Sequence, residues 1–131
     1  MILVRQYRHN LKRYTLEFPA GAVTEGEALD VAARRELEEE TGYILAPGTQ
    51  LRPLGSFYSL PSETNKYTHV FLAEPVTAAG PPVLDTLIEK YFDMSVTEMP
   101  VGEVMDSIGD SIGGTETITA LMLARPKLGS G

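Results

Sequence analysis

The segment 35–40, which reads RELEEE, contains acidic residues whose spacing could hold a metal ion. On a helix, residues three and four positions apart lie on one face, so Glu36, Glu39 and Glu40 would project together. Their carboxylates repel one another near the negative end of the helix dipole, which costs stability unless a cation is bound. Magnesium takes oxygen ligands and usually binds through a few carboxylates together with substrate phosphates. The spacing therefore indicates a Mg2+ site, whereas an isolated acidic run is more often a solvated helix face.

The apolar residues of the same helix favour the metal site over the solvated face. We expect one stripe of this helix to be buried, formed by Leu29, Ala32, Ala33 and Leu37. Glu36 and Glu40 project to the side of that stripe and extend it. Carboxylates at the border of a buried stripe are better placed to bind an ion than to be solvated.

A longer motif surrounds the acidic segment. Gly21, Glu27 and the segment 35–42 reproduce the pattern G-x5-E-x7-R-E-U-x-E-E-x-G-U, where U is an aliphatic residue. Only the last position departs from it, because Tyr43 stands where an aliphatic side chain is usual, and an aromatic ring can fill the same apolar slot. A motif that fixes polar residues and glycines at this many positions is specific. By these residues the chain resembles the Nudix hydrolases.

The resemblance implies an α/β (α+β) fold, namely an α/β/α sandwich with a mixed sheet and a metal-binding loop-helix-loop. It also implies a site for Mg2+, with Mn2+ as an alternative ion. The implied ligands are three carboxylates and one backbone carbonyl: Glu36, Glu39, Glu40 and Ala20. Arg35, which belongs to the catalytic motif, would orient the helix together with Glu27. Gly21 and Gly42 would serve as a tight turn and a helix C-cap.

Flanking segments resemble the ADP-ribose pyrophosphatase branch, whose members hydrolyse nucleoside diphosphate sugars. These segments are VRQYR at 4–8, EFPAG at 17–21, the loop at Pro61 and the closing segment 109–124. The implied reaction is attack of a metal-activated water on one phosphorus, which gives a nucleoside monophosphate and a sugar phosphate. A general base outside the motif would assist. Glu63, Asp85 and Glu89 are the alternatives, of which we assign Glu89 to catalysis and Glu63 to substrate binding as hypotheses.

Arg8 is the candidate for binding a substrate phosphate or ribose. It ends a predicted strand, and a guanidinium binds phosphate in a bidentate manner. The alternative for Arg8 is a surface salt bridge. By analogy, Glu17 would hydrogen-bond the sugar or base. Phe57, Tyr58 and Tyr67 could stack on a base, although aromatic residues on strands more often belong to the core.

The secondary structure that must position these residues follows from periodicity and from turn residues. A Thr24-x-x-Glu27 capping box predicts that the central helix begins at Thr24, and Gly42 predicts its end. We expect strands at 1–8, 14–18, 51–60, 68–76 and 87–94, and further helices at 98–108 and 115–124. This order predicts one α/β or α+β domain with a mixed or antiparallel sheet.

Length, composition and charge limit the number of domains and the kinds of binding partner that we expect. The 131 residues, 43% of them hydrophobic, suffice for one core, so we expect a single domain over 1–131 that lacks the N-terminal strands usual in the branch. In that branch the strands build much of the dimer interface and part of the nucleotide pocket. Either another subunit or another surface compensates in a homodimer, or the pocket is more open and the specificity broader, or the sequence is a truncated form. The net charge of −7 disfavours nucleic acid, and no apolar stretch is long enough to cross a bilayer. The absence of cysteine indicates the cytoplasm. We therefore expect a soluble protein with a small nucleotide substrate.

Two alternatives to this function stay open. A Nudix-type domain could bind a nucleotide sugar without cleaving it, although such domains usually lose a glutamate of the motif and none is lost here. A Nudix hydrolase could also act on other nucleotides, such as deoxynucleoside triphosphates or dinucleoside polyphosphates. Substrate turnover distinguishes the three possibilities.

Overall fold

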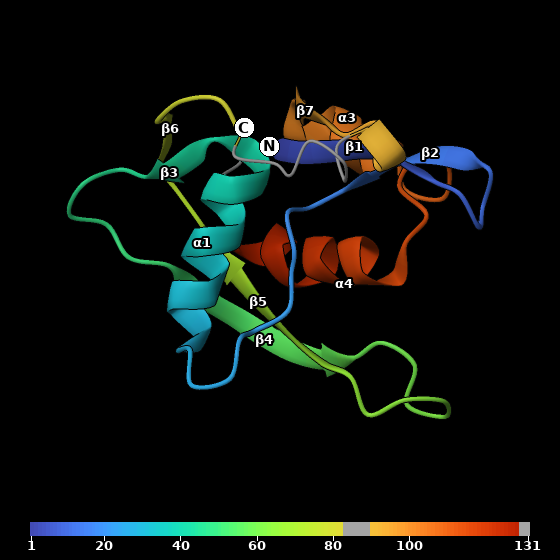
Figure 1. Ribbon diagram of the computed structural model, residues 1–131, viewed down its shortest axis with the longest axis horizontal. Coiled ribbons are helices and arrows are strands. Elements are labelled where there is room, and N and C mark those ends of the chain that lie inside the picture. The colour runs from blue at the N-terminus through green and yellow to red at the C-terminus, as the bar shows by residue number, and fades with distance from the viewer. Residues whose placement is uncertain (83–89, 129–131) are drawn as a thin grey trace.

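The computed structural model of the protein describes residues 1–82 and 90–128 (Figure 1). Helices and strands are interspersed along the chain, which confirms the predicted α/β (α+β) class. The strands of these ranges are β1 (Ile2–Arg8), β2 (Arg13–Glu17), β3 (Tyr43–Leu45), β4 (Arg52–Tyr58), β5 (Tyr67–Leu72), β6 (Val76–Ala78) and β7 (Ser95–Glu98). The helices are α1 (Leu29–Thr41), α3 (Val101–Asp106), α4 (Thr115–Ala124) and a 3-10 turn at Arg125–Lys127.

The described strands pair in three antiparallel sheets, with the orders β2-β1-β7, β3-β6 and β4-β5. In Figure 1, α4 lies between the β2-β1-β7 sheet and the β4-β5 hairpin. Helix α1 stands beside them and contacts β1, β3 and β5. The loop after β2 passes in front of α4 and reaches the start of α1 (Figure 1). This loop and α1 therefore face each other.

The core forms where β1, α3 and α4 meet. Its buried residues are Leu3, Met99, Val104, Ile112 and Leu121. Full burial of one such side chain contributes about 1.5–3 kcal/mol relative to leaving it exposed. This core fixes β1 against α4, and it thereby fixes the positions from which the segments after β1 and β2 leave the sheet.

Helix α1 begins later than predicted, at Leu29 and not at Thr24. Thr24 and Glu27 do contact each other, since the Thr24 N–H donates to Glu27 Oε1 at 3.1 Å, but they close a turn in the loop. Gly26 stands within that turn at a φ of +80°, a left-handed conformation that a helix cannot contain. The predicted buried stripe is also wrong at its first residue, because Leu29 is 39% exposed. The predicted end is confirmed: Gly42 is a left-handed C-cap.

Other elements agree with the predictions to different degrees. The predicted strands at 1–8 and 14–18 are confirmed as β1 and β2, and the predicted helix at 115–124 is confirmed as α4. The strand predicted at 87–94 lies partly outside the described residues, and it is wrong at 90–92, which are helical. The short strands β3 and β6 were not predicted as separate elements. No helix within 1–82 or 90–128 is long and apolar enough to cross a membrane.

Candidate active site

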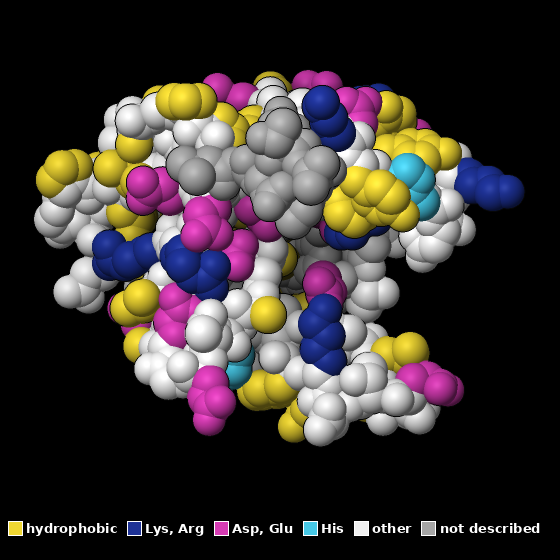
Figure 2. All heavy atoms as spheres, viewed as in Figure 1, with side chains coloured by type: hydrophobic (Ala, Val, Ile, Leu, Met, Phe, Trp, Pro, Cys, Tyr) yellow, Lys and Arg dark blue, Asp and Glu magenta, His cyan; other side chains and the backbone are white. Residues whose placement is uncertain are grey.

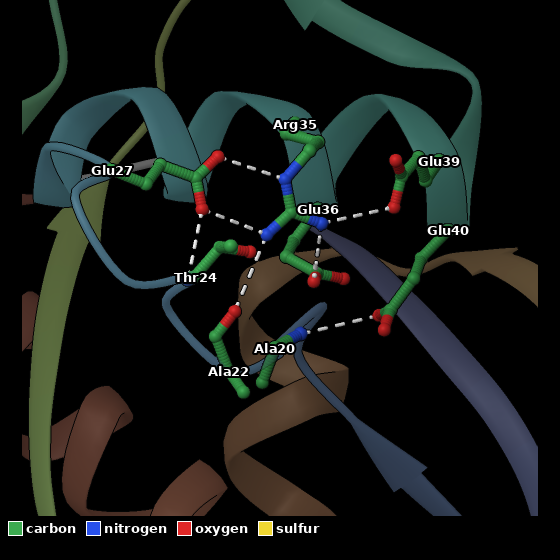
Figure 3. Close-up of polar contacts among 8 residues, drawn as sticks. All are labelled: Ala20, Ala22, Thr24, Glu27, Arg35, Glu36, Glu39 and Glu40. Carbon is green, nitrogen blue, oxygen red and sulfur yellow. Dashed lines mark hydrogen bonds and ion pairs between the residues drawn. The ribbon is translucent and has the colours of Figure 1, made fainter.

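Arg35 lies at the centre of the contacts between α1 and the preceding loop (Figure 3). Its Nε and Nη2 donate to the two carboxylate oxygens of Glu27 at 2.9 and 3.0 Å, and Nη2 also approaches the Ala22 carbonyl at 3.3 Å. The hydrogen bonds from Arg35 lower the pKa of Glu27 to about 2. Because Glu27 and Ala22 belong to the loop, the guanidinium fixes the loop against the helix, as the motif implies.

The same guanidinium also holds two of the predicted metal ligands. Nη1 of Arg35 donates to Glu36 Oε1 at 2.9 Å and to Glu39 Oε2 at 3.3 Å. The side chain of Glu36 is only 17% exposed, so its carboxylate lies inside the fold of the loop. Arg35 therefore positions both carboxylates on the side of the helix that faces the loop.

Gly21 provides the space for Glu36. A Cβ atom built on Gly21 would lie 2.1 Å from the carboxylate carbon of Glu36 and 2.1 Å from its Oε1, so the end of the Glu36 side chain would have to move. The backbone at Gly21 has no left-handed φ, and the residue forms no turn, so its predicted role as a tight turn is wrong. The motif requires glycine here because a carboxylate packs directly on the backbone.

Glu40 lies on the other side of the site from Arg35. Its Oε2 accepts a hydrogen bond from the Ala20 N–H at 3.1 Å (Figure 3). Burial and the negative charges of Glu36 and Glu17 raise the pKa of Glu40 to about 7, against the opposing effects of the Ala20 N–H and Arg8. The carboxylate of Glu40 is therefore short of positive charge, which a divalent cation could supply.

The donor set matches the oxygen ligands that Mg2+ prefers, but it is not gathered around one point. Among the described residues, no group of three or more His, Asp or Glu side chains stands close enough together to hold a metal. The reason lies in the contacts above, since Arg35 binds Glu36 and Glu39 while Glu40 turns to the Ala20 N–H. The residues fit a divalent cation by chemistry and by their common face on α1, and they would exchange these contacts for the ion.

Arg8 and Glu17, predicted separately as substrate-binding residues, are paired with each other. Arg8 Nε and Nη2 donate to the two Glu17 oxygens at 2.9 and 2.7 Å, and the Thr15 hydroxyl donates to Glu17 at 2.5 Å. Burial alone would raise the pKa of Glu17, but the hydrogen bonds from Arg8 and Thr15 and the Arg8 charge lower it overall. The charges of both Arg8 and Glu17 act on Glu40, so the pair lies beside the glutamates of α1.

Of the remaining predicted site residues, those that the structure describes belong to the β4-β5 hairpin. Glu63 is in the connection between β4 and β5, and no recorded hydrogen bond or ion pair of the described residues joins it to the glutamates of α1. Tyr58 and Tyr67 face each other across that hairpin with ring centroids 4.6 Å apart. Glu89 and the alternative base Asp85 lie outside the described residues.

The sequence reasoning missed the rings that gather near Arg8. His9, Tyr91 and Phe92 contact one another, and the Arg8 guanidinium carbon lies 5.9 Å from the centroid of the Phe92 ring. His9 and Tyr91 are 82 positions apart in the chain. Local patterns cannot show such a contact, and only the pairing of β1 with β7 brings the two segments together.

Comparisons with known proteins agree with the geometry of the loop and helix. A family model of the NUDIX domain matches residues 1–110, and the chain therefore belongs to the Nudix family. It is 42% identical over 77 residues to the ADP-ribose pyrophosphatase of Bacillus subtilis, covering 59% of this chain and 40% of that protein. It is 58% identical over 43 residues to the ADP-sugar pyrophosphatase of Mus musculus, covering 33% of this chain and 20% of that protein.

A solved structure described as an ADP compounds hydrolase has the same fold, with a TM-score of 0.79 and 26% sequence identity over 97% of this chain and 65% of that chain. Together these matches confirm the predicted resemblance to the ADP-ribose pyrophosphatase branch. The chain spans less than half the length of the two pyrophosphatases and about two thirds of the solved structure.

Proposed function

We propose that this chain hydrolyses the diphosphate bond of a nucleoside diphosphate sugar such as ADP-ribose, giving a nucleoside monophosphate and a sugar phosphate. The observation that carries the proposal is the network in which Arg35 joins Glu27 of the loop to Glu36 and Glu39 of α1. Such a network holds carboxylates on one face of a helix, where they can bind a metal ion and, through it, phosphate. Two relatives of this chain, an ADP-ribose pyrophosphatase and an ADP-sugar pyrophosphatase, support the substrate class.

Glu36, Glu39, Glu40 and the Ala20 carbonyl would hold the divalent cation, either Mg2+ or Mn2+. Such an ion, when bound, supplies an activated water and neutralises the charge that develops on the phosphates. Arg35 donates to two of the carboxylates that would hold the ion, and we therefore assign it the role of a positioning residue. Its pKa is raised by the hydrogen bond to Glu27, so it stays charged throughout.

Arg8 would bind a phosphate of the substrate. Its Nε and Nη2 are used by Glu17, whereas Nη1 has no recorded partner within residues 1–82 and 90–128. Glu17 would hold the guanidinium in place. Substrate binding would then lose less side-chain entropy, because Arg8 is already ordered. Glu63 as a substrate contact and Glu89 as general base stay hypotheses from the sequence.

The test is hydrolysis of a substrate panel, with products followed by 31P NMR. The panel contains ADP-ribose, GDP-mannose, UDP-glucose, a dinucleoside polyphosphate and a deoxynucleoside triphosphate, each with Mg2+, with Mn2+ or with EDTA. We expect turnover of the nucleotide sugars with either ion and none with EDTA. Turnover of the triphosphate or the dinucleoside polyphosphate alone would overturn the substrate class. Binding of ADP-ribose with no product from any compound would support a non-catalytic binding module instead.

A further inference from the structure

Five aromatic rings near Arg8 pack together outside the buried core. We call the rings of Tyr7, His9, Tyr14, Tyr91 and Phe92 the aromatic cluster. The buried core lies elsewhere, around Leu3 and Leu121. In Figure 2, hydrophobic side chains and a histidine gather over the region of β1 and β2, above a hollow that separates them from the β4-β5 hairpin.

Within the aromatic cluster, Tyr91 and His9 are exposed to solvent, whereas Tyr7, Tyr14 and Phe92 are partly buried. The rings of His9 and Tyr91 lie 4.2 Å apart between centroids with an interplanar angle of 30°, so one face of Tyr91 is covered. Phe92 packs edge-on against Tyr91 at 4.8 Å and 87°. Tyr91 is nevertheless 59% exposed. A further planar ring could extend this stack in the offset geometry that aromatic rings prefer.

Arg8 connects the aromatic cluster to the glutamates of α1. Its guanidinium lies near the Phe92 ring, binds Glu17, and acts electrostatically on Glu40. A ligand whose phosphate bound Arg8 would therefore have the aromatic cluster on one side and the glutamates of α1 on the other. A nucleoside diphosphate has this form, since it joins a planar base to a diphosphate.

We propose that the exposed face of Tyr91 stacks on the nucleobase of the substrate. The inference rests on the proposed function, and it adds a base-binding site to it. Every base has a π face, so a tyrosine stack contributes affinity without selecting strongly among bases. Specificity for the base would then be low, and affinity for the nucleoside part of the substrate would depend on the ring of Tyr91.

The hairpin tyrosines provide a matched control. Tyr58 is 57% exposed and packs against Tyr67, so it resembles Tyr91 in exposure and in having a ring neighbour. Among the described residues, however, no arginine lies over either of these rings. The sequence analysis gave Tyr58 and Tyr67 as candidates for base stacking. Because these two rings lie on the hairpin with no arginine over them among the described residues, we favour Tyr91 for this role.

The experiment measures the affinity of adenosine monophosphate and of ribose 5-phosphate by calorimetry in Mg2+, for the unaltered protein and for variants. We expect Tyr91→Leu to weaken binding of adenosine monophosphate by roughly 10-fold, as loss of one aromatic stack predicts. Binding of ribose 5-phosphate should not change. Tyr91→Phe should bind both ligands as the unaltered protein does, and so should Tyr58→Leu.

Three outcomes would overturn the inference. These are no binding of adenosine monophosphate to the unaltered protein, equal weakening of both ligands in Tyr91→Leu, or a change in molecular mass by light scattering, which would make Tyr91 part of a contact between proteins. The proposed function is tested separately by turnover of ADP-ribose. If the unaltered protein turns over ADP-ribose while Tyr91→Leu retains its affinity for adenosine monophosphate, only the base site is wrong.

Discussion

Two arginine-glutamate pairs border the glutamates of α1, and they differ in how many of their donors are used. Arg35 binds Glu27 through Nε and Nη2, and Arg8 binds Glu17 through the same two atoms. The Nη1 of Arg35 binds two glutamates of α1, whereas the Nη1 of Arg8 has no recorded partner in the described part of the chain. Among the described residues, the guanidinium of Arg35 uses all of its nitrogens to hold the loop and the helix, while that of Arg8 uses two, and a guanidinium nitrogen can bind an anion. On the proposed function, Arg35 would position the metal ligands and Arg8 would bind the substrate.

The largest effect should come from the glutamates of α1 that would hold the metal ion, and Glu40 tests them without removing a partner of Arg35. If Glu40 holds the metal ion as proposed, we expect Glu40→Gln to lower kcat by more than about 100-fold, because loss of a direct ligand should exceed the 10–100-fold cost of losing an outer partner. Glu38 is the matched control, since it is exposed on the same helix and its side chain has no recorded contact in the described residues. Steady-state kinetics with ADP-ribose provide the measurement. Equal activity of Glu40→Gln and Glu38→Gln would contradict the metal site.

A lysine in place of each arginine sharpens the comparison. Lysine keeps the charge but loses the fork that binds two oxygens at once. Arg35→Lys should lower kcat by about 10–100-fold with a smaller change in KM, as expected for an outer partner of a metal site. Arg8→Lys should raise KM by about 10-fold, as expected for one charged hydrogen bond to phosphate. The opposite assignment of kcat and KM would show that the roles of the two arginines are reversed.

Gly21→Ala perturbs Glu36 without touching either arginine. The new Cβ would displace the end of the flexible Glu36 side chain, so we expect kcat to fall by roughly 10-fold or more while Tm changes little. Gly42→Ala is the contrasting variant, because its Cβ would meet the Gly80 carbonyl oxygen at 2.2 Å and its φ is +75°. Both problems at Gly42 involve backbone, so that variant should lower Tm markedly. Similar Tm values for both variants would disprove this distinction.

Glu27 and Glu17, the partners of the two arginines, should affect how the stability of the fold depends on pH. Both have a folded pKa below the usual 4.5, so above that pH their pairs contribute stability, which is lost as pH falls through the folded pKa. For these two glutamates stability should therefore rise with pH up to about 4.5, where the unfolded chain binds more protons, whereas the raised pKa of Glu40 acts in the opposite direction between 4.5 and about 7. Urea unfolding of the unaltered protein, Glu27→Gln and Glu17→Gln between pH 3 and 7 measures this. Each variant should have a shallower slope, and an unchanged slope would show that its pair does not affect folding.

The smallest effect should come from the exposed pair that joins the hairpin to α4. Lys66 Nζ lies 2.6 Å from Glu116 Oε1, but the two side chains are 60% and 37% exposed. Exposed ion pairs contribute about 0–1 kcal/mol. Glu116→Gln should therefore change the free energy of unfolding by less than about 1 kcal/mol in urea unfolding. A larger loss of unfolding free energy would show that the Lys66–Glu116 pair stabilises the fold more than an exposed ion pair should.

The sequence by itself determined the family, the class of fold and the position of the glutamates on one helix. These features were predictable because they depend on local spacing: a helix brings residues three and four positions apart to one face, and a glycine ends it. The same local reasoning gave β1, β2 and α4 correctly. It misplaced the start of α1, because Glu27 is bound by Arg35 and not by a helix cap.

Only the tertiary structure decided how the carboxylates are held and what lies beside them. Arg8 and Glu17 were each assigned to substrate, but they lie on the paired strands β1 and β2, and their long side chains reach each other although the register sets Glu17 opposite Val4. Likewise, His9 meets Tyr91 because β1 also pairs with β7. Contacts between distant segments depend on which faces are buried together, and a pattern within one segment carries no information about its partner.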